Sequence, residues 1–141
     1  MHASLLGIRC SPMGPDVADL AEDSGALLNI TGVVMPGDRY RMLELQFASG
    51  VLTLSCDDDT DELIAEVGHA RPVAVLIADP WVDGLIGKRI EYAWELRNHR
   101  GYLDGFQLRL VDDQHDEEVR QFEVAESGID VRWIPATRAS A

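Results

Sequence analysis

The stretch GKRIEYAWELRNHRGYLDGFQLRLV, residues 87–111, decides the fold. Across residues 90–96, large apolar side chains occupy every second position, and mostly charged ones lie between them. A period of two is typical of a β-strand with one buried face. A second alternating run ends the stretch, and the Asn-His-Arg-Gly turn at 98–101 contains residue types that tolerate positive φ. The pattern predicts a β-hairpin at the centre of the core, with Tyr92 and Trp94 facing inward.

Shorter apolar runs on both sides of this hairpin predict further strands. They lie at 26–35, 40–48, 51–56, 73–78, 119–125 and 129–133. The run 73–78 is apolar throughout, so we expect it to be a buried strand. One short helix is predicted at 15–23, where Pro15 suits the first turn and Gly25 can end it. Residues 1–14 show no clear period and are interpreted as a loose lead-in.

These patterns predict a mainly β fold: an antiparallel meander, or a sandwich or half-barrel, of about eight or nine short strands with one short N-terminal helix. An α+β class is the alternative, because Leu63–Val67 fits one face of a helix as well as a strand. The length of 141 residues suits one domain. We assign residues 1–134 to a single globular domain and residues 135–141, rich in small side chains, to a mobile C-terminal tail.

The three tryptophans are assigned by their surroundings. Trp94 and Trp133 occupy apolar positions of alternating strands and are expected in the core. Trp81 follows Pro80 in a connection between strands and is expected to be exposed. An exposed tryptophan close to acidic residues is typical of an anchor for a protein partner.

The charge balance narrows the function classes. The chain has 25 acidic and 12 basic residues, which gives a net charge of −13. A domain this acidic repels nucleic acid and anionic membrane surfaces and attracts basic proteins. No signal peptide or membrane-spanning run is recognised, and Cys10 and Cys56 are interpreted as reduced thiols. A cytoplasmic location is therefore expected.

Tests for catalytic and metal-binding patterns are negative. Asp57, Asp59 and Asp61 match the first ligand positions of the helix–loop–helix calcium pattern, but Glu62 replaces its glycine and Gly68 its bidentate glutamate. A looser calcium site formed by the loop carboxylates is the alternative to a solvated loop. The four histidines lack zinc-binding spacing, and the sequence contains no nucleophile motif or phosphate-binding loop. We therefore predict no catalytic residues, no metal and no cofactor.

The central hairpin also carries a family resemblance. The positions concerned are Gly87, Lys88, Ile90, Trp94, Asn98, Gly101, Tyr102 and Asp104. They resemble the pattern G-K-x-I, an aromatic-rich strand and N-x-x-G-Y-x-D of a family of small bacterial domains of unknown function. The resemblance implies a compact β-rich domain, favours a strand at 62–67 and implies no reaction. In type rather than in motif, the chain is also similar to immunity proteins of bacterial toxin systems, which are small, cytosolic and often acidic.

Two functional hypotheses follow. In the first, the chain is a non-catalytic module that binds a basic protein, most concretely an immunity protein or antitoxin that neutralises a toxin or effector. The expected partner-binding residues are Asp57, Asp58, Asp59, Asp61, Glu62, Trp81, Asp113, Asp116 and Glu117. In the alternative, the chain is a β-domain, catalytic or not, that binds a small anionic metabolite. The expected anion contacts are the basic residues around the hairpin, Lys88, Arg89, Arg97 and Arg100.

Overall fold

The computed structural model describes the backbone of residues 3–5, 8–12 and 15–16 and all atoms of residues 17–57, 59–68 and 74–135. In these ranges the chain forms one α-helix, α1 (Pro15–Glu22), and one 3-10 turn, η1 (Pro80–Val82). The strands are β1 (Ala3–Leu5), β2 (Ile8–Pro12), β3 (Leu27–Met35), β4 (Arg39–Phe47), β5 (Gly50–Cys56), β6 (Leu63–Gly68), β7 (Val75–Leu76), β8 (Arg89–Arg97), β9 (Leu103–Val111), β10 (Glu117–Ala125) and β11 (Gly128–Ile134).

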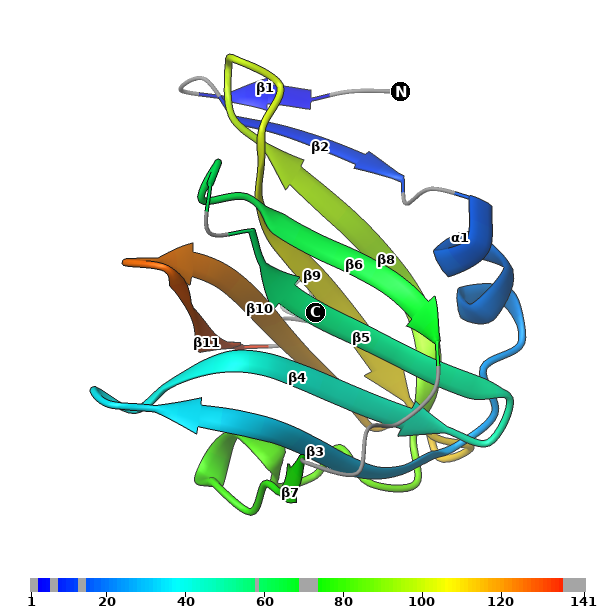
Figure 1. Cartoon of the computed structure of the whole chain (residues 1–141). Coiled ribbons are helices and arrows are strands. Elements are labelled where there is room, and N and C mark those ends of the chain that lie inside the picture. Colours follow the sequence, from blue (N-terminus) through cyan, green and yellow to red (C-terminus); the bar gives the residue numbers. More distant parts are fainter. Residues whose placement is uncertain (1–2, 6–7, 13–14, 58, 69–73, 136–141) are drawn as a thin grey trace.

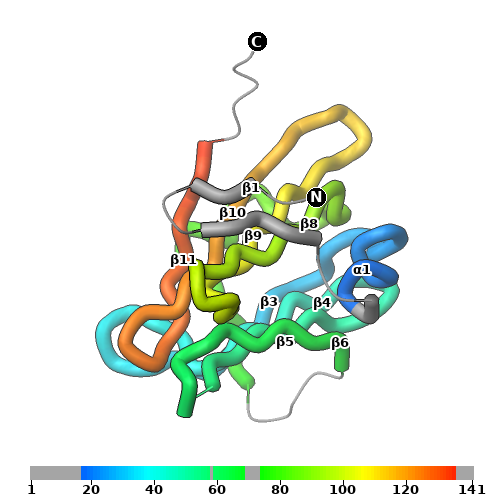
Figure 2. The backbone as a smooth tube through the Cα atoms, turned by 90° about the horizontal axis from the view of Figure 1, so that it is seen from above, coloured from blue at the N-terminus to red at the C-terminus, as the bar shows by residue number. Residues whose placement is uncertain are grey.

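The strands form one curled antiparallel sheet. Its order is β1-β2-β8-β9-β10-β11-β4-β3-β7, and β5 and β6 branch from β4. The curl occurs between β11 and β4, which share only one backbone pair, Ile129 with Tyr40. Figures 1 and 2 show that β5 and β6 consequently lie across from β8, β9 and β10. The fold is therefore the predicted mainly β half-barrel with one short helix.

The core fills the space inside the curl. Phe106 and Phe122, from the β9 and β10 side, are fully buried with a ring separation of 6.4 Å. Leu52 and Leu54 reach the same cluster from β5. Helix α1 lies against β5, β6 and β8, and Val17 and Leu20 form its buried face. The short N-terminal helix that the sequence predicted thus closes one side of the half-barrel.

The predicted central hairpin is present, but Tyr92 and Trp94 lie on the opposite face from the one predicted. The register between β8 and β9 shifts twice, once next to Arg97 and once next to Ile90. A shift of one residue moves the following side chains to the opposite face of a strand. Ile90 is buried, whereas Tyr92 and Trp94 lie on the exposed face, Trp94 with 37% of its surface accessible. The prediction that both rings belong to the core is therefore wrong.

The predictions for the other two tryptophans are reversed: Trp81 is buried and Trp133 is exposed. Trp81 is only 8% exposed, and its ring packs edge-on against Tyr40 at 5.9 Å and Phe122 at 5.8 Å. Its indole N–H donates to the Tyr40 hydroxyl at 2.8 Å, and that hydroxyl donates to Asp79. Burial, followed by the Asp79 hydrogen bond, raises the pKa of Tyr40 to about 12. Trp133 is half exposed, so the predictions for Trp81 and Trp133 are both wrong.

A buried arginine holds the turn that carries Trp81. Arg120 is 1% exposed; its guanidinium donates to the carbonyl oxygens of Trp81 at 2.7 Å and Asp83 at 3.0 Å. The same group pairs with Glu118 at 2.9 Å and lies 4.3 Å from the centre of the Trp133 ring. A fourth acceptor is the Val119 carbonyl at 3.0 Å, and because four acceptors surround one buried cation, this turn is fixed to β10. No local sequence pattern predicted these contacts of Arg120.

Three further expectations are settled by the strand assignments. Residues 3–5 and 8–12, expected within a loose lead-in, form β1 and β2, and β2 pairs with β8. The ambiguous run at 62–67 is strand β6, as the resemblance favoured. In the run expected as a buried strand at 73–78, the structure shows only the two-residue β7, with both side chains exposed. The predicted mobile tail, apart from Pro135, lies outside the described residues.

Candidate functional site

The two acidic turns lie at opposite ends of β9. The loop Asp57–Glu62 joins β5 to β6, and the Glu62 carboxylate accepts a hydrogen bond from the backbone N–H of Leu103, the first residue of β9. The other acidic turn, residues 112–116, begins directly after the last residue of β9. Nine residues of strand span about 27 Å. The structure therefore does not bring the two predicted acidic clusters together.

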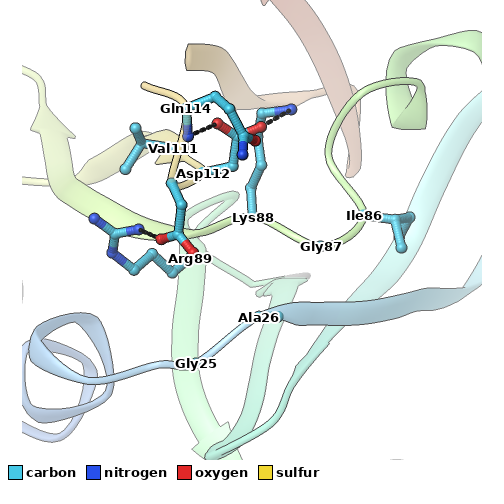
Figure 3. A pocket seen from close by; sticks show the side chains of 10 residues that line it. Gly25, Ala26, Ile86, Gly87, Lys88, Arg89, Val111, Asp112 and Gln114 are labelled. Carbon is cyan, nitrogen blue, oxygen red and sulfur yellow. Dashed lines mark hydrogen bonds and ion pairs between the residues drawn. The ribbon is translucent and has the colours of Figure 1, made fainter. Parts of the chain in front are cut away.

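The acidic turn 112–116 is tied to basic residues of the hairpin. The Lys88 amine, almost fully buried, lies 3.8 Å from an Asp112 oxygen (Figure 3). It lies 3.2 Å from an Asp116 oxygen. Arg89 pairs with Asp113 at 3.5 Å. A hydrogen bond from the backbone N–H of Asp116, with Lys88 adding to it, holds the pKa of Asp112 below its usual value. The neighbouring strand β10 continues this pairing, since Glu117 meets Arg109 at 3.5 Å.

The acidic loop 57–62 is organised without basic partners. The Asp57 carboxylate accepts hydrogen bonds from the backbone N–H groups of Asp59 at 2.8 Å and Thr60 at 3.3 Å. Asp61 adopts a positive φ of 57°, and its carboxylate lies 3.6 Å from the Cys56 sulfur. Within the described part of the chain, no ion pair involves Asp57, Asp59, Asp61 or Glu62. Asp58 lies outside the described residues.

A hollow beside this loop gathers more carboxylates. It has a volume of about 380 Å³, and its acidic lining residues are Asp61, Asp104 and Glu123. Burial raises the pKa of Asp104, and the charges of Asp61 and Glu62 raise it further, against a hydrogen bond from Asn98. Leu96 contributes an apolar wall. We call this feature the acidic hollow. Among the described residues no three His, Cys, Asp or Glu side chains are placed to hold a metal ion.

Two exposed aromatic rings lie next to the acidic hollow. Trp94 precedes Leu96 by two residues on β8, so both side chains leave the same face about 7 Å apart. The Tyr92 and Trp94 rings are 6.3 Å apart, and the Arg109 guanidinium lies 5.9 Å from the Tyr92 ring centre. Tyr92 and Trp94, and not Trp81, are therefore the exposed aromatic side chains close to acidic residues.

One sequence signal marks a register shift of the hairpin, but not the one that exposes this pair. Gly105 interrupts the apolar pattern of β9, and an isolated glycine in a strand often marks a bulge. A Cβ atom on Gly105 would lie 3.1 Å from the Phe122 carbonyl oxygen and 3.2 Å from the Leu96 side chain. The register shift next to Arg97 occurs opposite this position. The shift that exposes Tyr92 and Trp94 lies between Ile90 and Tyr92, where no glycine signals it.

The basic residues of the alternative hypothesis are separated. Lys88 and Arg89 line a cavity of about 510 Å³ at one end of the hairpin (Figure 3). Arg97 lies at the other end, where it pairs with Glu95 at 2.8 Å and donates to the Gly101 carbonyl at 2.9 Å; Arg100 is in the adjoining turn. The four cations do not converge on one site, and the two that share a cavity are already paired with carboxylates.

Comparisons with known proteins place the chain in a family. No curated protein and no solved structure matches it. Among the described residues, no helix is long and apolar enough to span a membrane. Residues 22–138 match the model of the Family of unknown function (DUF6334). The chain therefore belongs to this family, which confirms the resemblance to an uncharacterised domain family.

Proposed function

We propose that this chain is an acidic protein-binding module that captures a basic partner through the loop 57–62 and the acidic hollow. The narrower form of the proposal is an immunity protein or antitoxin that neutralises a basic toxin or effector. The observation that carries the proposal is the charge that remains unpaired at this end. Most described basic side chains already form ion pairs within the chain: Arg39, Lys88, Arg89, Arg97, Arg109, Arg120 and Arg132.

Unpaired carboxylates in one loop repel one another and gain from a cationic partner. A surface of one charge sign accelerates association with an oppositely charged protein by tenfold or more at low salt. The acidic hollow adds a place for a single cationic side chain. The carbon stem of a lysine or arginine can lie along Leu96 while its charged end meets Asp61 and Asp104. Glu123, at the side of the acidic hollow, is paired with Arg132 at 3.6 Å.

Steering by charge is separate from anchoring by desolvated contacts. Tryptophan, tyrosine and arginine are the residue types most enriched among side chains that dominate binding energy. Tyr92, Trp94 and Arg109 supply all three types on one exposed face, next to the acidic hollow. We assign to these three side chains the anchor role that was predicted for Trp81.

The alternative function, binding of an anionic metabolite, is supported by the cavity of about 510 Å³ beside Lys88 and Arg89. Each cation there is paired with an aspartate, and a ligand would have to displace those carboxylates. A titration with inorganic phosphate and citrate, followed by NMR shifts of the Lys88 and Arg89 amides, tests this alternative directly.

The test of the main proposal uses the tagged full chain as bait in a lysate of the source organism at about 50 mM and about 300 mM salt. The loop variant removes four charges while keeping hydrogen-bond acceptors: Asp57→Asn, Asp59→Asn, Asp61→Asn and Glu62→Gln. The matched control removes four exposed charges elsewhere: Asp19→Asn, Glu22→Gln, Asp23→Asn and Glu66→Gln.

We expect one basic protein to be retained by the wild type and the control at low salt. The loop variant should associate with it at least tenfold more slowly. For the narrower form, an equimolar amount of this chain should inhibit the activity of the captured protein. Equal association rates and an equal salt dependence for loop variant and control would exclude the loop as the interface.

A further inference from the structure

The edge of the sheet at β3 and β7 exposes a cluster of apolar side chains. Leu28, Leu76 and Ile86 are each half or more exposed, and Leu76 is the most exposed at 67%. We call these three residues the apolar edge. They adjoin a groove of about 320 Å³, into which the largely buried Ile30 and Ile77 also face. From this geometry we propose that the apolar edge is a self-association surface, which a second copy of this chain covers.

The size of the cluster supports an interface. Three side chains that are half or more exposed present about 300 Å² of apolar surface, the range in which surface patches on monomers are often functional. Two facing copies bury twice this area, and with the surrounding residues they approach the roughly 1,000 Å² of a weak specific interface. We therefore expect a dimer with a dissociation constant in the micromolar range.

The shape of the apolar edge is self-complementary. Leu76 projects from β7 at the rim of the groove that it helps to form. In a twofold interface each copy contributes the same patch, so a protruding side chain of one copy enters the groove of the other. β7 is also the last strand of the sheet in the described order, so its outer side pairs with no other described strand.

Charge explains why a second copy would dock here and not elsewhere. Two chains of net charge −13 repel each other, and among the described residues that line this groove Asp83 is the only ionisable one. The acidic loop 57–62 follows β5, and strands β3 and β4 lie between β5 and β7 in the sheet. A neutral apolar patch at the far edge is the region where two copies can approach with little repulsion.

This inference does not depend on the proposed binding of a basic partner, and salt separates the two. Screening weakens the attraction between opposite charges, so a basic partner binds less well as salt rises. Screening also weakens the repulsion between two acidic copies, so their apolar contact tightens. A chain can therefore fail one test and pass the other.

The experiment is sedimentation of the full chain from about 1 to 200 µM in about 50 and 500 mM NaCl. We expect the dimer fraction to grow with concentration and with salt. Leu76→Glu and, separately, Ile86→Glu should weaken the dimer at least tenfold. The matched control is Val67→Glu, which places the same charge on an exposed valine of β6 and should leave the dimer intact. Circular dichroism confirms that each variant is folded.

A wild-type chain that stays monomeric at 200 µM in high salt would overturn the proposal. An equal loss of dimer in the Leu76→Glu and Val67→Glu variants would also overturn it, because the effect would then be general charge repulsion. A monomeric wild type whose capture of a basic partner is abolished by Leu76→Glu would reassign the apolar edge to that partner.

Discussion

The acidic turn 112–116 and the acidic loop 57–62 are both rich in aspartate, but they differ in whether basic side chains lie beside their carboxylates. The turn is paired with Lys88 and Arg89, and these contacts join the beginning of the β8–β9 hairpin to its end. The loop holds its shape through backbone N–H groups and has no ion pair within the described chain. A run of carboxylates is therefore structural or available for binding according to whether the fold places a cation beside it.

The largest expected effect on stability concerns Arg120, the buried arginine that pairs with Glu118. Arg120→Met removes the donors to Trp81 and Asp83 and leaves Glu118 without its cation. We expect a loss of about 3–5 kcal/mol in the free energy of unfolding, the range for breaking a buried pair. Urea denaturation measures it. The control is Arg132→Met, an exposed arginine paired with Glu123 at 3.6 Å, which should cost less than about 0.5 kcal/mol.

The second largest effect concerns Lys88, which pairs with Asp112 and Asp116 of the turn 112–116. Lys88→Met keeps the buried side-chain volume but leaves Asp112 and Asp116 without their cation. We expect a loss of about 2 kcal/mol, less than for Arg120 because Asp116 is largely exposed and solvated. Arg89→Met, which breaks the exposed pair with Asp113, should change stability by less than about 0.5 kcal/mol. Equal effects of the two variants would contradict the distinction drawn between them.

A direct comparison neutralises four acids in each region. The loop variant described above should gain about 0.5 kcal/mol, because it removes repulsion and keeps the hydrogen-bond acceptors. The turn variant should lose about 1–2 kcal/mol, because it removes the partners of paired cations. It consists of Asp112→Asn, Asp113→Asn, Asp116→Asn and Glu117→Gln. A loss of stability in the loop variant would mean that its carboxylates have structural partners after all.

The smallest effect is a difference in pH dependence. The pKa of Asp112 is lowered by folding, so its stabilising contribution is present above its ordinary pKa of 3.8 and is lost as pH falls through the lower folded value. The pKa of Asp104 is raised, so its contribution is complete below 3.8 and is lost as pH rises through the higher folded value. Asp104→Asn should therefore raise stability at pH 7, and Asp112→Asn should lower it.

Carboxyl NMR titrations, with urea denaturation at pH 3 and pH 7, measure both signs. At pH 3 the Asp104→Asn variant should approach the wild type, because the Asp104 carboxyl is protonated there. The stability deficit of Asp112→Asn should shrink as pH falls from 7. If the Asp104 carboxyl titrates below 3.8, burial does not dominate its surroundings, and the acidic hollow is not desolvated.

The elements that were predictable from the sequence are those set by local patterns. The β8–β9 hairpin, the β3–β4–β5 meander and helix α1 each follow from a periodicity and a turn inside one stretch. The resemblance to an uncharacterised domain family is confirmed by the match over residues 22–138. For the candidate site, the sequence identified the acidic loop 57–62 but not the exposed rings beside it.

The missed features depend on contacts between distant segments. Tyr92 and Trp94 changed faces because the register of β8 against β9 shifts between Ile90 and Tyr92, which the alternation within β8 does not record. Trp81 is buried because Arg120, far along the chain, draws its turn onto the sheet. The unequal pairing of the two acidic regions depends on where Lys88 lies in three dimensions.

The single backbone pair between β11 and β4 has a consequence for how the molecule opens. Because Ile129 and Tyr40 provide the only register pair between the described residues at this junction, side-chain contacts hold the two halves of the sheet together there more than backbone hydrogen bonds do. Among these contacts, Arg39 pairs with Glu126 and Asp130. Cooperative unfolding units often coincide with hairpins and meanders. In native-state hydrogen exchange, we therefore expect the amides of β3–β6 and those of β8–β11 to exchange as two separate groups, with the junction as the boundary.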